Sequence, residues 1–178
     1  MSRPVPSVTR RDQVIAGLAA IAIGLQVLEA AIPSPVPGIK PGLANIVTLV
    51  ALLALGWRAA AAVTLLRVVG SGLLLGTLLG PAFWLSLAGA LSALLVLGAL
   101  APLAPRHVGP VGLAIASSLG HVGGQFLLAW ALIIPHPNLL LVLPPLLLAA
   151  LITGGVTGIL AAHVLADPRV QRHVHRPA

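Results

Sequence analysis

The chain has no cysteine and only three acidic residues, and both shortages narrow its chemistry. Without cysteine there are no disulfides, no iron–sulfur ligation and no thiolate metal sites. The acidic residues Asp12, Glu29 and Asp167 stand against ten lysines and arginines. This basic excess does not indicate a nucleic-acid partner, because it lies at the chain ends and in short loops and forms no basic face interleaved with aromatics. Basic residues so placed are expected to face anionic lipid headgroups.

What the chain has in abundance is apolar sequence. Hydrophobic residues make up 58% of the 178 residues and charged residues 7%, with a mean hydropathy of +1.09. A water-soluble domain of this length does not have a core large enough to bury so much apolar surface, so the composition indicates a membrane protein. The apolar stretch that ends near Ala31 is too long for a signal peptide and is expected to be a retained first helix.

Proline, glycine and charged residues divide the chain into six apolar segments. A bilayer core about 30 Å thick needs about 20 apolar residues per helix, and most segments meet this length. We therefore predict an all-α membrane protein, a six-transmembrane-helix bundle at 13–166 between a basic N-terminus, 1–12, and a basic tail, 167–178. The predicted spans are 13–32, 42–56, 59–79, 82–101, 109–134 and 139–165.

The basic residues also predict the orientation, because arginine and lysine in short loops stay on the cytoplasmic side. All arginines outside the spans fall on one side if both termini are cytoplasmic, which predicts a multi-pass protein of the bacterial cytoplasmic membrane. The residues concerned are Arg3, Arg10, Arg11, Arg58, Arg106, Arg169, Arg172 and Arg176. Lys40 is the exception, because it lies in the first outer loop.

Four pairs of polar residues lie within the apolar segments, and their spacing of three or four residues places both members of a pair on the same helix face. Such residues usually face a bundle interior or a cavity, because unpaired polar groups are costly in lipid. The helical rise places most of them in the outer half of the bundle, beneath the Lys40 loop. They predict a polar pocket that opens outward. The pairs are Gln26 with Glu29, Asn45 with Thr48, Arg67 with Ser71, and His121 with Gln125.

Structural roles compete with ligand contact for several of these residues. Glu29 and Arg67 fit either a buried ion pair or ligand contacts. His121 fits either a core histidine or a ligand contact, but not a metal site, because its helix has no second ligand at metal spacing. The histidine-bearing tail is expected to face headgroups. Serines in the spans, such as Ser86, and glycines at small-xxx-small spacing are expected to be helix contacts. The glycines are Gly72, Gly76, Gly80, Gly120 and Gly124.

Five stretches resemble the membrane family called heptaprenyl diphosphate synthase component I, also labelled Gx transporter. They are "PGIKPGLANIVTLVAL", "LLRVVGSGLLLGT", "FWLSLAGALSALL", "LGHVGGQFLLA" and "LPPLLLAALITGGVTGIL". The resemblance covers about residues 12 to 165, and it departs from the family pattern at Pro41 and Val122. That family is grouped with the substrate-binding S components of energy-coupling factor transporters, which implies six helices and an outward ligand pocket. The residues that it marks are Lys40, Gly42, Asn45, Arg67, Gly70, Ser86, Gly89, His121 and Gln125.

The family name suggests prenyl chain synthesis, which ordinarily needs aspartate-rich motifs to hold magnesium and diphosphate. Three scattered acidic residues do not provide such motifs, so we expect no catalysis by this chain alone and no cofactor. The first hypothesis is a small-molecule binding or transport subunit for an isoprenoid- or quinone-like ligand, with a partner membrane protein or energising module. The alternatives are an assembly or electron-transfer subunit, and a membrane accessory of a soluble prenyl synthase. The expected ligand-binding residues are Lys40, Asn45, Arg67, His121, Gln125, Glu29, Gln26 and Ser86.

Replacing Lys40 by alanine or glutamine is expected to weaken ligand binding without unfolding the bundle, because Lys40 is predicted to supply positive charge to a ligand head. Binding in detergent, measured beside thermal stability, checks this expectation. Unchanged affinity would remove the assigned role.

Overall fold

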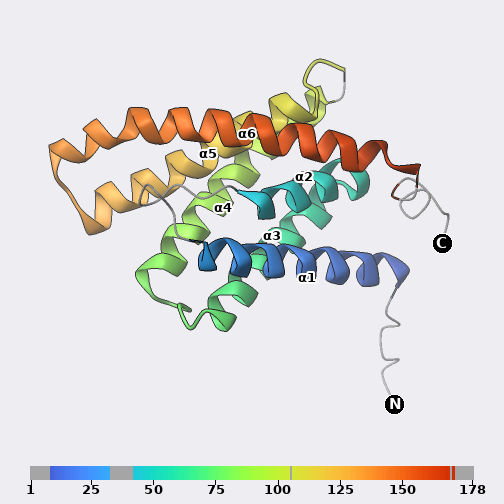
Figure 1. The fold of residues 1–178 in the computed structure, drawn as a ribbon, viewed down its shortest axis with the longest axis horizontal. Coiled ribbons are helices and arrows are strands. Elements are labelled where there is room, and N and C mark those ends of the chain that lie inside the picture. Colours follow the sequence, from blue (N-terminus) through green and yellow to red (C-terminus); the bar gives the residue numbers. More distant parts are fainter. Residues whose placement is uncertain (1–8, 33–41, 105, 169, 171–178) are drawn as a thin grey trace, which may run out of the picture.

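The computed structural model describes residues 9–32, 42–104, 106–168 and 170, and the regular elements of this part are all helical. Lys40, with the rest of its loop, lies outside the described residues. Six α-helices follow one another along the chain (Figure 1). They are α1 (Arg10–Ala31), α2 (Leu43–Leu55), α3 (Trp57–Leu74), α4 (Pro81–Leu100), α5 (Pro110–Leu128) and α6 (Leu143–Ala166). Three short elements extend them: η1 (Ala101–Leu103), η2 (Ala129–Ile133) and η3 (Pro137–Val142).

Among the described residues, five helical stretches are long and apolar enough to cross a membrane: Arg10–Ala31, Trp57–Leu74, Pro81–Leu103, Pro110–Ile133 and Pro137–Ala166. The remaining α-helix, α2, has 13 residues and is about 20 Å long. The all-helical, multi-pass class is thus confirmed in its coarse form. The count of six spans and the membrane orientation stay predictions.

Glycines with positive φ explain where two helices end. Gly56 has a φ of 88° and separates α2 from α3 without any longer loop, a conformation that glycine adopts without steric penalty. Gly76 has a φ of 65°, and its turn follows the end of α3 at Leu74, five residues before the predicted end at 79. The expectation that Gly76 is a helix contact was wrong, because a Cβ there would meet nothing within 4 Å.

Other helix starts follow from side-chain capping and proline. Thr9 and Asp12 form a capping box, in which the Asp12 N–H donates to Thr9 Oγ1 at 3.3 Å and the Thr9 N–H donates to Asp12 Oδ2 at 3.0 Å. This box explains why α1 begins at Arg10, ahead of the predicted 13. Pro81 and Pro110 open α4 and α5, where a missing N–H leaves no intrahelical bond unmade.

Helix α2 lies at the centre and packs against α1, α3, α5 and α6, while α4 joins α3 to α5. The core around α2 is apolar and includes Ala51 and Val63, both fully buried. Glycines let the later helices approach closely, as expected for small residues in membranes. A Cβ on Gly120 would lie 2.8 Å from Val96 Cγ2 of α4, and one on Gly158 would lie 2.6 Å from Val111 Cα of α5.

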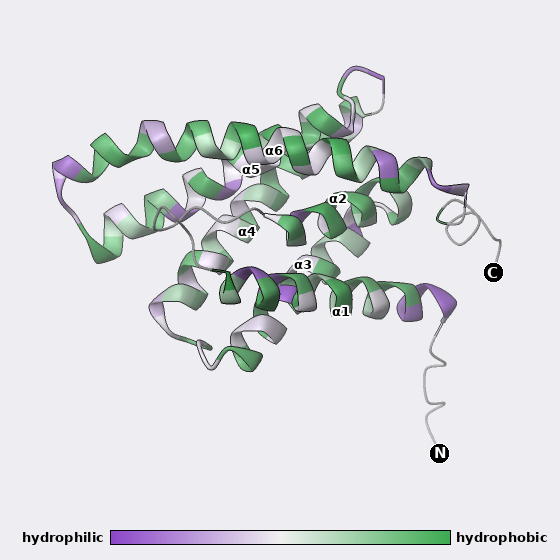
Figure 2. Ribbon diagram, in the orientation of Figure 1, coloured by the Kyte–Doolittle hydropathy of each residue, from purple (hydrophilic) through white to green (hydrophobic). Residues whose placement is uncertain are grey.

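Large apolar side chains remain exposed on the outside of the bundle, including Leu95 (70% exposed) and Leu132 (75%). In Figure 2 the hydrophobic colour runs along most of α1, α4 and α6, and the strongest hydrophilic colour is found mainly at helix ends. Exposure of this extent is what a lipid-facing surface requires. The fold is therefore apolar outside, and its described interior contains the polar side chains considered below.

Four of the arginines predicted to share one side, Arg10, Arg11, Arg58 and Arg106, belong to the described residues and lie near one end of the bundle, whereas Arg3, Arg169, Arg172 and Arg176 lie outside the described residues. The start of α1, the end of α2 and the start of α3 lie there together with the connection between α4 and α5 (Figure 1). A direct bond joins two of these ends, because Arg11 Nη2 donates to the Leu55 carbonyl at 3.0 Å. The clustering agrees with the arginine pattern on which the predicted orientation rests.

The absence of native cysteine allows a direct test of that orientation. His107→Cys and Asn138→Cys place single thiols at exposed positions in opposite connections. We expect a membrane-impermeant maleimide to label the Asn138→Cys variant in intact spheroplasts, and the His107→Cys variant only after permeabilisation. The reverse pattern would invert the predicted topology.

Candidate functional site

A cavity of about 660 Å³ lies among the helices, and each of the six α-helices contributes to its wall. This volume is in the range of small-molecule sites in proteins. Its apolar wall includes Leu75, Phe83, Phe126 and Leu146. Seven of the eight predicted site residues line it: Gln26, Glu29, Asn45, Arg67, Ser86, His121 and Gln125.

Arg67 and Glu29 are the two buried charges among the described residues of this wall. Its side chain is 5% exposed and lies on the α3 face that also carries Ser71, one turn further on. Its Nη1 donates to Asn45 Oδ1 of α2 at 3.1 Å, and its charge interacts favourably with that of Glu29. Three helices are therefore connected through one guanidinium group. Of the two alternatives for Glu29 and Arg67, an ion pair or ligand contacts, this charge interaction agrees with the first and does not test the second.

Glu29 also stabilises the start of α2. Its Oε1 accepts a hydrogen bond from the backbone N–H of Leu43, the first residue of that helix. Gly42, at the preceding cap position, has no side chain for this purpose, and the N-terminal end of a helix dipole favours a negative charge. A carboxylate from α1 thus takes the place of a local cap and fixes α2 at the edge of the cavity.

Gln26 and Ser86 bring α1 and α4 together on another side of the cavity. Gln26 Nε2 donates to Ser86 Oγ at 3.4 Å, which is a long hydrogen bond. Ser86 was expected to be a helix contact and was also marked by the family resemblance as a site residue. The structure gives Ser86 an interhelical bond and a place in the wall, and its role in ligand binding stays a prediction.

His121 and Gln125 lie one turn apart on α5 and pack against Gly89 of α4. A Cβ on Gly89 would lie 2.7 Å from Gln125 Cγ, 2.8 Å from His121 Cε1 and 2.9 Å from His121 Nε2. Only glycine leaves room for both side chains at this crossing. Gly89, which the resemblance marked, therefore positions the two residues and need not contact any ligand itself.

Three buried polar atoms in this wall have no hydrogen-bond partner in the structure: Gln26 Oε1, Arg67 Nε and His121 Nδ1. An unsatisfied buried polar group costs about 1–3 kcal/mol, and native proteins contain few of them. All three side chains line the same cavity. The three atoms themselves are buried, so other atoms of the same side chains form the surface of the cavity.

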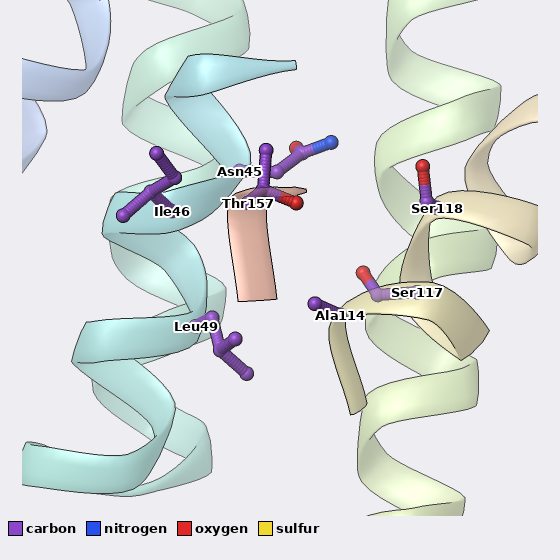
Figure 3. A pocket seen from close by; sticks show the side chains of 7 residues that line it. All are labelled: Asn45, Ile46, Leu49, Ala114, Ser117, Ser118 and Thr157. Carbon is purple, nitrogen blue, oxygen red and sulfur yellow. The ribbon is translucent and has the colours of Figure 1, made fainter. Parts of the chain in front are cut away.

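A second, smaller chamber adjoins the first (Figure 3). Its volume is about 10 Å³, room for about one water molecule, and Asn45 and Ser118 line both spaces. Figure 3 shows Asn45 on α2 on one side of the chamber and Ser117 and Ser118 of α5 on the other; in this view Thr157 is drawn beside Asn45. The amide and hydroxyl groups make this a polar pocket of water size behind the larger cavity.

Some residues of the cavity wall were not among the predicted ligand-binding residues. In addition, only one member of the predicted inward pair Asn45 and Thr48 lines the cavity. Ser118 and Thr153 line the cavity, and Ser118 was detectable because it lies three residues before His121 on the same helix face. Thr48, expected to accompany Asn45, instead forms a buried 3.0 Å hydrogen bond with Thr64 of α3. Within the described ranges, no group of three or more histidine, aspartate or glutamate residues is arranged to hold a metal ion.

Residues 18–164 match the model of a family described as heptaprenyl diphosphate synthase component I. The match extends from the middle of α1 to nearly the end of α6, so it includes the seven predicted residues that line the cavity. Comparison with curated proteins and with solved structures returns no match.

The contact at Gly89 predicts a stability difference between two glycines. Gly89→Ala is expected to destabilise the protein by about 1–3 kcal/mol, because the added methyl group collides with His121 and Gln125. The matched control is Gly155→Ala in α6, where a Cβ meets nothing within 4 Å. Thermal unfolding in detergent measures both variants. Equal melting temperatures would show that the crossing at Gly89 is not tight.

Proposed function

The chain belongs to the heptaprenyl diphosphate synthase component I family, and from this premise we propose that it is a membrane-embedded accessory component that holds a lipophilic small molecule. The molecule occupies the large cavity, with its polar head near Arg67, His121 and Gln26 and its apolar part against the leucine and phenylalanine wall. The ligand class is isoprenoid- or quinone-like.

One observation carries this proposal: polar side chains from several helices line one cavity of ligand size inside an apolar bundle. A bundle that needed only to be stable would fill such a space with hydrocarbon, because cavities and unsatisfied polar groups both destabilise a fold. Polar residues inside membrane bundles commonly mark ligand or ion sites. A bound molecule would fill this space and contact the polar side chains of the wall.

The proposed role is binding, and catalysis is assigned to a partner. The family description names component I of a synthase, which implies a further subunit. Prenyl transfer ordinarily needs several carboxylates around magnesium and diphosphate, whereas this chain has three acidic residues in total. Of these, Glu29 lies at the cavity and already accepts from the α2 backbone. The aspartate-rich site therefore belongs to the other component.

A second candidate is an assembly subunit in which the polar residues only hold the helices together. The family description favours it, since a component of a synthase can act by recruiting its partner to the membrane. The bonds from Arg67 to Asn45 and from Glu29 to α2 suit this role equally well. The two candidates differ in one respect, because an assembly subunit needs no occupant in the cavity.

Native mass spectrometry of the gently purified protein separates the two. We expect the wild-type chain to retain a lipophilic molecule and the Ala149→Trp variant to lose it, because Ala149 lines the cavity and an indole would fill part of it. Leu148→Trp is the matched control, because Leu148 directly precedes Ala149 but its own side chain is 59% exposed on the outside of α6.

Retention by wild type and by Leu148→Trp together with loss by Ala149→Trp supports the binding role. An empty wild-type protein, or equal retention by all three, would contradict it. Co-purification of an aspartate-rich synthase with an empty protein would favour the assembly role.

A further inference from the structure

The smaller chamber lies between three helices, behind the wall of the large cavity. Its apolar side is formed by Ile46 and Leu49 of α2 and Ala114 of α5, and its polar side chains come from α2, α5 and α6. With a volume of about 10 Å³ it has room for about one water molecule. A lipophilic ligand does not fit into a space of this size.

Arg67 determines which end of the Asn45 amide is left to face this chamber. A guanidinium group only donates hydrogen bonds, and Arg67 Nη1 donates to Asn45 Oδ1 at 3.1 Å. The amide oxygen is therefore engaged on the α3 side, and Nδ2, with its two hydrogens, is the other end. In Figure 3 this nitrogen is drawn on the side of Asn45 that faces α5. An N–H group in the interior of a membrane bundle requires an acceptor.

Ser117 lies on the opposite side of the chamber (Figure 3). Its side chain is 7% exposed and lines the chamber but not the large cavity. Within the described part of the chain, neither its hydroxyl nor Asn45 Nδ2 has a hydrogen-bond partner. Both atoms keep surface that a water molecule can reach, unlike the three sealed polar atoms of the large cavity. A donor and a hydroxyl group thus face one water-sized space from two helices.

We infer that the chamber is a binding site for one structural water molecule, which accepts from Asn45 Nδ2, donates to Ser117 Oγ and so links α2 to α5. Buried waters in proteins typically make about three hydrogen bonds. The hydroxyl groups of Ser118 and Thr157, which also line the chamber, supply the further oxygen that this number requires. The inference does not depend on the proposed function, because it assumes no ligand in the large cavity.

An ion fits this site less well than water does. A cation needs several oxygen ligands, whereas Asn45 turns N–H groups toward the chamber and is bonded to the positive charge of Arg67. Chloride is larger than water, and the chamber has room for about one water. A water molecule fixes the Asn45 amide at the end that Arg67 does not hold. Ser117 is therefore a positioning residue for Asn45, and through Asn45 for Arg67 in the large cavity.

A structure of the full chain in nanodiscs, at a resolution that shows buried waters, tests the site directly. We expect a single rounded density within about 2.7–3.2 Å of both Asn45 Nδ2 and Ser117 Oγ. A chamber filled by side chains, or Asn45 Nδ2 bonded directly to the protein, would overturn the inference. Density in the large cavity is a separate result, so the water site and the proposed function can fail independently.

A double-mutant cycle tests the link in solution. Asn45→Ala and Ser117→Ala are each expected to lower the melting temperature in detergent. The double variant is expected to lose clearly less than the sum of the two shifts, because either change already removes the water-mediated link. The control pair is Asn45→Ala with Ser92→Ala, since Ser92 of α4 faces Gly124 of α5 and lines neither space. This pair is expected to be additive.

Additive shifts for Asn45→Ala and Ser117→Ala would contradict the link. If Asn45→Ala does not fold, the wild-type structure decides.

Discussion

The buried guanidinium of Arg67 is the constraint on which the centre of this molecule depends. A charge in the interior of a membrane bundle costs several kcal/mol unless neighbouring groups satisfy it. Here Asn45 of α2 accepts from it and Glu29 of α1 balances its charge, so three helices must be held in one relative position. The same carboxylate accepts from the first N–H of α2. The cavity lies beside this group, where hydrocarbon packing would leave polar atoms without partners.

Hydropathy and the positions of proline and glycine were enough to predict the helices. Pro81 and Pro110 mark two helix starts, and Gly56 marks the break between α2 and α3. The inward faces followed from residues spaced three or four apart, which is why seven of the eight predicted residues line one cavity. The small-residue spacing wrongly predicted a helix contact at Gly76, because the backbone there forms a turn with positive φ.

Other features depend on which helices meet and were beyond sequence reasoning. The bond between Gln26 and Ser86 joins residues 60 positions apart. The role of Gly89 depends on the crossing of α4 and α5, which brings His121 and Gln125 over a position without a side chain. Glu29 was predicted to be a site residue, but its bond to the α2 backbone depends on the relative placement of two helices, which the sequence does not give. These contacts bring separate polar faces together in one cavity wall.

A bound molecule is expected to complete this wall, and an experimental structure of the protein in lipid nanodiscs tests this most directly. We expect elongated non-protein density in the cavity, with its polar end beside Arg67, His121 and Gln26 and its remainder against Phe83 and Phe126. A cavity closed by hydrocarbon side chains, with Arg67 Nε, Gln26 Oε1 and His121 Nδ1 bonded to the protein itself, would contradict it.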